Sequence, residues 1–99
     1  MPALAAVALR NRLLAIDASL VVKLKNVRVN GALFGCSGCV TDPRTGRVVY
    51  VNTDHNHGTR WDNALYRRAK DDRDFTGGTN HTASYADLPQ QVVALLRNI

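Results

Sequence analysis

Cys36 and Cys39 stand three positions apart, a spacing that can support metal binding or redox chemistry. A C-x-x-C pair can supply half of a zinc site or a redox couple. Zinc takes four ligands in structural sites, and the histidines available to complete one are His55, His57 and His81. The pair falls inside a predicted strand, where positions i and i+3 point to opposite faces. The alternative interpretation is two buried thiols that pack as small apolar side chains.

A short polar segment, Asp54-His55-Asn56-His57, follows the cysteines. A D-H-x-H sequence after C-x-x-C is similar to the pattern of ββα-metal nucleases, as in phage resolvase-type endonucleases. The resemblance covers residues 36–57 and implies a histidine general base with a divalent ion at the scissile phosphate. The second C-x-x-C of that pattern is absent, and a strand is predicted where the motif has its helix. The alternative is a solvent-exposed loop whose Asn, Asp and Gly residues form turns.

Basic residues recur on the predicted strands and are candidates for binding an anionic partner. They are Lys23, Lys25, Arg28, Arg47, Arg67 and Arg68. If they share a face, the sheet presents a basic platform, with Tyr50 and Tyr66 available to stack on bases. The alternative is an ordinary solvated sheet face.

The loop around Gly77, Gly78 and Thr79 is a second candidate for anion binding. Paired glycines with flanking hydroxyl groups can form a backbone nest for an anion or a phosphate. The segment lacks the strand–G-x-x-x-x-G-K–helix context of a nucleotide-binding loop. The alternative is a loop that Phe75 anchors by packing.

Two turns define the elements that must position these residues. Asn30-Gly31 between apolar runs predicts a type I′ hairpin, which needs positive φ at both residues. Asp42-Pro43-Arg44-Thr45-Gly46 predicts a second turn, in which the glycine takes the left-handed position. The predicted strands are residues 20–29, 32–41, 47–53 and 64–70.

The first two strands carry irregularities. The first strand changes phase at Asn26, which predicts a β-bulge near Lys25-Asn26. Gly35 and Gly38 in the second strand predict a bend or the close approach of another backbone, and we expect that neighbour to be a terminal helix.

Helices are predicted at both ends of the chain. Residues 3–16 place Leu9 and Leu13 on one apolar face, and a second helix starts at Asp87, where Asp87 and Gln90 form a capping box. The fold class is therefore α+β: an antiparallel β-meander of three to four strands with N- and C-terminal helices, in the order α-β-β-β-(β)-α. We expect both helices on one face and a single domain over residues 1–99.

The charge balance favours acidic partners. Thirteen Lys and Arg residues against eight acidic residues, all of them Asp, leave a formal charge of +5. Codon bias towards arginine is the alternative explanation.

No run reaches the roughly 20 apolar residues of a membrane span, so no transmembrane segment is expected. Residues 1–16 contain no acid, are rich in Ala and Leu, and carry Arg10 and Arg12, which is typical of a mitochondrial presequence.

Three hypotheses on function follow. The first is a non-catalytic accessory subunit of a multiprotein assembly, a mitochondrial respiratory-chain complex or ribosome, with the cytoplasm as the alternative location. Its partners would be other protein subunits. The hypothesis rests on the presequence-like start, the long loops and the lack of a recognisable set of catalytic residues. The second is a small basic RNA-binding module. The third is a metal-dependent, ββα-metal-like nuclease. No cofactor is predicted.

Overall fold

A computed structural model describes residues 3–54 and 62–97. Within these ranges the elements are, in order, α1 (Ala6–Ile16), β1 (Val21–Val29), β2 (Ala32–Asp42), β3 (Arg47–Asn52), β4 (Asn63–Ala69), β5 (His81–Ser84) and α2 (Leu88–Arg97). The five strands form one antiparallel sheet in the order β1-β2-β3-β4-β5. The predicted α+β meander between terminal helices is therefore confirmed, with a sheet larger than the predicted three to four strands.

The additional strand is β5, which the sequence placed inside a loop. It spans four residues and pairs with the first half of β4, from Asn63 opposite Ser84 to Tyr66 opposite His81. A four-residue strand at the edge of a sheet is too short to show a clear hydrophobic period. Its pairing with β4 is therefore visible only in the tertiary structure.

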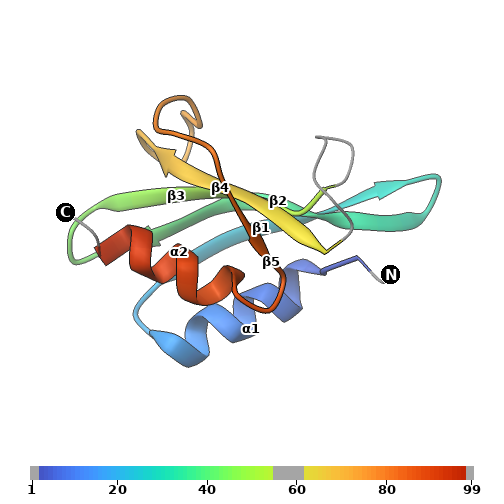
Figure 1. Ribbon diagram of the computed structural model, residues 1–99, viewed down its shortest axis with the longest axis horizontal. Helices are drawn as coiled ribbons and strands as arrows, with labels where there is room; N and C mark the ends of the chain where they lie inside the picture. Colours follow the sequence, from blue (N-terminus) through green and yellow to red (C-terminus); the bar gives the residue numbers. More distant parts are fainter. Residues whose placement is uncertain (1–2, 55–61, 98–99) are drawn as a thin grey trace.

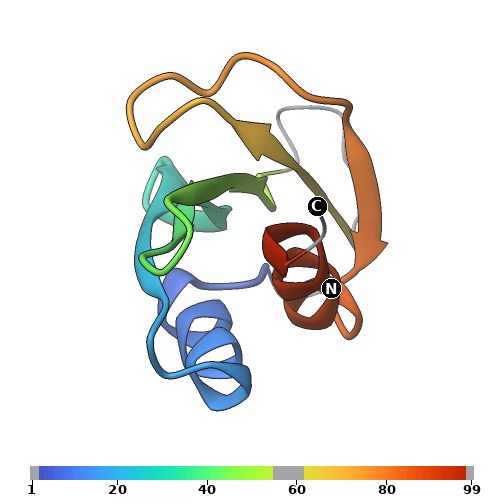
Figure 2. The ribbon, with the colours of Figure 1, turned by 90° about the vertical axis from the view of Figure 1, so that its left-hand side faces the viewer.

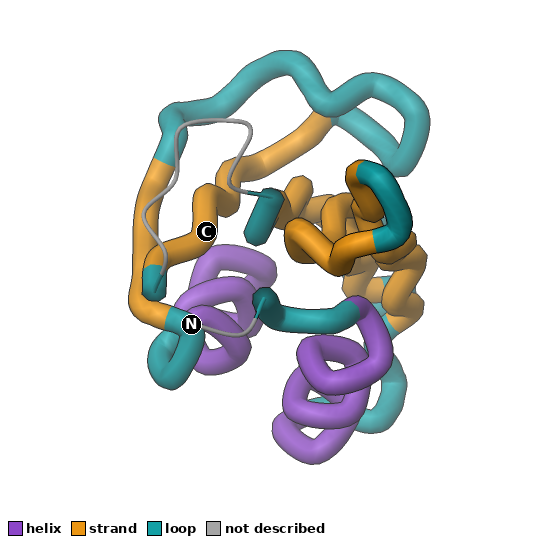
Figure 3. Tube along the Cα trace, turned by 90° about the vertical axis from the view of Figure 1, so that its right-hand side faces the viewer, coloured by secondary structure: helices purple, strands orange, loops and turns teal. Residues whose placement is uncertain are grey.

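Both helices cover the same face of the sheet (Figure 1). The sheet curves around α2, which lies in its concavity with α1 beside it (Figures 2 and 3). Leu9 and Leu13 of α1 and Leu96 of α2 are fully or almost fully buried against Val40 and Val49 of the sheet. We call this covered side the helix face and the opposite side the outer face.

The strand register assigns side chains to the two faces. Lys23, Cys39, Tyr50 and Arg67 are successive cross-strand partners from β1 to β4, and all four lie on the outer face. The neighbouring row is formed by Val22, Val40, Val49 and Arg68, and it lies on the helix face because Val40 and Val49 belong to the core. Residues adjacent in sequence are thus separated by the full thickness of the sheet.

Two glycines of β2 allow the close backbone contacts that their pattern predicts. A Cβ at Gly38 would lie 1.9 Å from the carbonyl oxygen of Lys23, and one at Gly35 would lie 2.4 Å from that of Thr53. Both glycines have φ near +150°, which other residues rarely adopt. The close approach is confirmed. The expected neighbour was wrong, because the glycines meet β1 and the end of β3 and not a terminal helix.

The β-bulge lies elsewhere than predicted. The register shifts between Val27 and Arg28, which face Gly35 and Leu33, so that Phe34 is the additional residue and lies on β2. The prediction at Lys25-Asn26 was therefore wrong. Asn26 has a tertiary role instead: its Oδ1 accepts the N–H of Ala6 at 2.8 Å and supplies α1 with a cap.

Both predicted turns are present. Asn30 and Gly31 have φ of 51° and 82°, as a type I′ turn requires. In the second turn the N–H of Gly46 donates to the carbonyl of Asp42 at 2.8 Å, and Gly46 has φ of 75°. The Asp42 carboxylate accepts the N–H of Arg44 at 3.0 Å, which closes the turn from its other end.

Candidate functional site

The predicted basic residues are divided between the two faces. Arg47 and Arg68 extend over the helix face, where they donate to the carbonyls of Leu96 and Leu95 at 3.3 and 3.2 Å. The last carbonyls of a helix lack partners within it and carry the negative end of its dipole. These two arginines therefore stabilise the C-terminus of α2, and the expectation of one shared basic face was wrong.

The predicted stacking residue Tyr66 is also on the helix face. It is 7% exposed and its ring stacks on His81, with the ring centroids 5.2 Å apart. Arg28 lies at the end of β1, where it donates weakly to the carbonyl of Gly31 at 3.4 Å. The outer face thus keeps Lys23, Lys25 and Arg67 of the predicted basic set, together with Tyr50.

The segment between β4 and β5, residues 70–80, crosses the outer face. Asp72 pairs with Lys23 at 2.8 Å. The ring of Phe75 stacks on Tyr50, with 4.9 Å between centroids and 28° between ring planes. Phe75 and Tyr50 form an aromatic ridge at the centre of the outer face, and Phe75 remains 39% exposed.

A hollow lies on each side of this ridge. The first hollow, a cavity of about 410 Å³, is lined by residues of β1 and β2, including Lys23, Lys25, Ser37 and Cys39, together with the ridge. The second hollow, of about 250 Å³, lies towards β4 and is lined by Asn52, Leu65, Arg67 and Asn80 with the ridge. Cations therefore stand on both sides of two aromatic rings.

The second hollow offers polar groups of a kind that hydrogen-bond planar ligands. Asn52 donates to the Tyr50 hydroxyl at 3.1 Å, and Arg67 donates through Nη1 to Asn80 at 3.3 Å. The guanidinium carbon of Arg67 lies 5.8 Å from the centroid of the Tyr50 ring. The Nε of Arg67 is buried and has no acceptor among the described residues. A buried donor without an acceptor is costly, and because protein atoms cover this Nε, the Nη groups of Arg67 are the ones that line the hollow.

The charges of the outer face are only partly neutralised within the chain. The Lys23 ammonium lowers the pKa of the Asp72 carboxyl by hydrogen bonding and charge attraction. Lys25 forms no ion pair with the described residues and is exposed. Lys25 and Arg67 are therefore two cations of the outer face that form no ion pair with the described carboxylates.

The two cysteines lie on opposite sides of the sheet, as their spacing predicts. Cys36 packs in the core and its N–H donates to Thr53 Oγ1 at 2.8 Å, whereas Cys39 lines the first hollow. Burial raises the pKa of Cys36, and burial with the nearby Asp72 raises that of Cys39 to about 11. Both thiols are therefore protonated and weakly nucleophilic near neutral pH.

The remaining metal and nuclease candidates, His55 and His57, lie outside the described residues. His81 stacks on Tyr66, away from both cysteines. In residues 3–54 and 62–97 no group of three or more His, Cys, Asp or Glu side chains could hold a metal ion. The nuclease hypothesis therefore has no further support from the residues that are described.

The predicted anion nest is an exposed turn packed on β4. Gly77 and Gly78 have φ of 100° and 73°, and a Cβ at Gly78 would lie 2.8 Å from the Arg68 carbonyl oxygen. The glycines thus allow the loop to pass close to a strand. Thr79 beside them is exposed. Anion binding by this turn stays a prediction.

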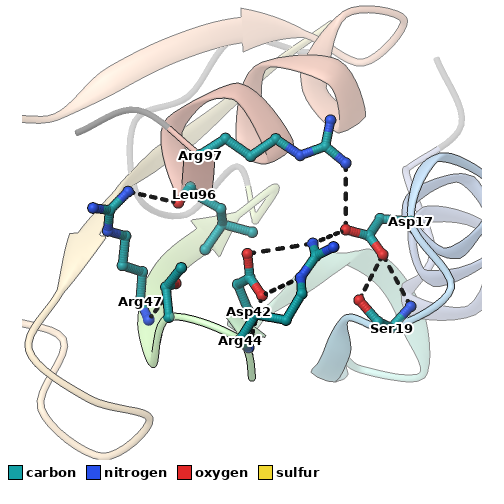
Figure 4. Close-up of polar contacts among 8 residues, drawn as sticks. Asp17, Ser19, Asp42, Arg44, Arg47, Leu96 and Arg97 are labelled. Atoms are coloured by element: carbon teal, nitrogen blue, oxygen red, sulfur yellow. Dashed lines mark hydrogen bonds and ion pairs between the residues drawn. The ribbon is translucent and has the colours of Figure 1, made fainter.

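An ion-pair network joins the ends of three elements (Figure 4). Arg44 contacts both Asp42 and Asp17, and Arg97 of α2 reaches Asp17 at 3.3 Å. Hydrogen bonds from Ser19 and the charge of Arg44 hold the pKa of Asp17 well below its usual range. The network connects the end of α1, the β2–β3 turn and the end of α2, so its role is structural.

A further surface is the tip of the β1–β2 hairpin, residues 27–34, which we call the hairpin arm. It projects beyond both helices along the long axis of the molecule (Figure 1). Val29 is 38% exposed, and Leu33 and Phe34 are half-buried. In the part of the chain that the structure describes, none of these three side chains belongs to the core or packs against it.

Sequence reasoning missed two groups of residues. The polar lining of the second hollow, Asn52 and Asn80, comes from segments 28 positions apart, and nothing local connects them. The apolar pair Leu33-Phe34 does carry a signal, since two adjacent apolar residues interrupt the alternation of a strand beside a turn. That interruption marks the bulge and, with it, the hairpin arm.

Comparison with known proteins gives no relative from which function could be inferred. The chain matches no protein family model, and no significant match was found among curated proteins or solved structures. In the described part of the chain, neither helix has the length and apolar character required to cross a membrane. Function has therefore to be argued from the surfaces.

Proposed function

We propose that this protein is a non-catalytic accessory subunit that docks into a larger protein assembly through the hairpin arm. The observation that carries the proposal is the projection of the hairpin arm beyond both helices, with Val29, Leu33 and Phe34 on it and outside the core cluster of the described residues. Each buried apolar side chain stabilises a folded state or a complex by roughly 1.5–3 kcal/mol. In the isolated chain Val29 is 38% exposed and Leu33 and Phe34 are only half-buried, so the arm realises only part of this contribution.

The chemistry of the arm defines the partner that it fits. Arg28 is exposed among the apolar side chains, and Lys25 precedes it on the same strand. The complementary surface is an apolar groove on another protein with carboxylates at its rim. A second copy of this chain is less suitable, because its arm would bring the same positive charges.

The N-terminal segment bears on the location that we propose. Residues 6–16, which read as part of a presequence, form α1 and place Leu9 and Leu13 in the core at 0% exposure. Their removal would leave a large unfilled space against the sheet. A mitochondrial assembly, respiratory-chain complex or ribosome, is therefore proposed with this segment retained in the mature subunit.

The test is capture of partners from the protein's own cells, with identification by mass spectrometry and a nuclease-treated parallel sample. The double variant Val29→Asp with Leu33→Ser replaces two of these three apolar side chains of the arm without touching the core. The matched control is Val7→Asp on α1, because Val7 is an exposed valine (60%) away from the arm.

We expect the same partners with wild type and Val7→Asp after nuclease treatment, and their loss with the arm variant. A wild-type protein that migrates alone near 10.8 kDa in native extract would overturn the proposal. So would partners that the arm variant retains in full.

A further inference from the structure

We propose that the outer face binds single-stranded nucleic acid, with one base held in the second hollow and the adjoining backbone running past Lys25. This site is separate from the hairpin arm and does not depend on the proposed docking function. It is built from the aromatic ridge and from the cations that flank it on β1 and β4.

The aromatic ridge supplies stacking. Phe75 covers one face of Tyr50, and its own ring is 39% exposed on a loop that lies over the sheet. Single-stranded nucleic acids are bound largely by bases that stack on aromatic side chains, and every base has a π-face that can do so. The ridge stands at the centre of the outer face, where a strand crossing the sheet would meet it.

The second hollow supplies hydrogen bonds to a base. Its volume of about 250 Å³ accommodates one base, and its walls combine the amides of Asn52 and Asn80 with the apolar Leu65. Asn side chains can pair with the donor and acceptor groups on a base edge. Arg67 also lines this hollow, and its guanidinium, which donates to Asn80 through Nη1 at 3.3 Å, adds N–H donors for a base carbonyl or a phosphate oxygen.

The charge pattern supplies attraction for the backbone. Lys25 is exposed and unpaired among the described residues, whereas Lys23 is held by Asp72. Release of Lys23 from Asp72 would add a second phosphate contact beside the first hollow. The three aspartates of the loop, Asp71, Asp72 and Asp74, oppose this attraction, so we expect binding of moderate affinity and strong dependence on salt.

The experiment measures fluorescence anisotropy of labelled 12-nucleotide RNA and DNA oligomers with the full chain at about 50 mM and about 200 mM salt. Phe75→Ala should weaken binding about tenfold through lost stacking, and Phe75→Tyr should restore it. Arg67→Gln should weaken binding at least threefold, and Lys25→Gln should weaken it about equally for all sequences and reduce the salt slope by about 1. Arg10→Gln is the matched control, because Arg10 is an exposed arginine on α1, behind the sheet.

An acidic peptide of the same length serves as competitor. Displacement of the oligomer by equimolar peptide would overturn the assignment in favour of a protein ligand, as would absence of salt-dependent binding at about 50 mM salt. Equal losses in Arg67→Gln, Lys25→Gln and the control Arg10→Gln would show that only net charge is being measured and would also overturn it. The difference between RNA and DNA affinities identifies which nucleic acid the site prefers. Failure here leaves the hairpin-arm proposal intact, because Val29 and Leu33 lie outside both hollows.

Discussion

Arg67 and Arg68 are neighbours in sequence but lie on opposite faces of β4. Comparing them shows how the two faces of the sheet differ. Arg68 reaches the last turn of α2 and donates to the Leu95 carbonyl, so its charge is used within the fold. Arg67 lies beside Tyr50 on the outer face, and its buried Nε–H has no acceptor in residues 3–54 and 62–97. On the helix face, Arg47 and Arg68 are bonded to the end of α2, whereas on the outer face Lys25 forms no ion pair with the described residues.

The largest expected effect is a difference in the stability lost when a core residue and a residue of the aromatic ridge are truncated. Leu96→Ala should cost about 3 kcal/mol, because Leu96 is 1% exposed and its truncation leaves a cavity under the sheet. Phe75→Ala should cost about 1 kcal/mol or less, since it removes one partly exposed aromatic contact. Urea denaturation followed by circular dichroism measures both. A loss of similar size in the two variants would mean that the ridge belongs to the fold and not to a binding surface.

The next effect compares the two arginines directly. Arg68→Gln should lower the free energy of unfolding by about 1–2 kcal/mol, because carbonyls at the end of α2 lose a charged donor. Arg67→Gln should change it by no more than about 0.5 kcal/mol. The same urea denaturation measures both variants. A larger loss of stability in Arg67→Gln than in Arg68→Gln would contradict the assignment of a structural role to Arg68 alone.

Acid should act first on the network at the ends of the helices. The folded protein lowers the pKa of Asp17 and Asp42, so the unfolded chain binds protons that the folded chain does not. The stabilisation that Asp17 and Asp42 supply is therefore fully present above the unfolded carboxyl pKa of about 4, and it is lost as the pH drops below that value. Melting temperatures between pH 7 and pH 2.5 should decline steeply in wild type and less so in Asp17→Asn. Parallel declines in both proteins would exclude Asp17 as a source of the acid sensitivity.

The smallest effect sharpens the outer face. Asp72→Asn removes the partner of Lys23, and the freed ammonium should raise affinity for a single-stranded oligomer about two- to threefold at low salt. Asp87→Asn is the control, because it makes the same change of charge at the start of α2 behind the sheet. An equal gain in both variants would attribute the effect to net charge alone.

The local sequence by itself determined the turns, the identity of four strands and both helices, and the opposite placement of Cys36 and Cys39. Each of these depends on steric rules that operate over two to five residues: positive φ at Asn30, Gly31 and Gly46, or the alternation of side chains along a strand.

Tertiary structure alone decided which set of alternating side chains the helices would cover. Arg47, Arg68 and Tyr66 lie on the helix face for this reason. The position of the bulge at Phe34 and the pairing of β5 with β4 were likewise decided by tertiary contacts. It also let Asn26 cap a helix 20 residues earlier in the chain and brought Asn80 beside Asn52. These outcomes depend on contacts between distant segments, whose free energies are settled only when the helices pack on the sheet.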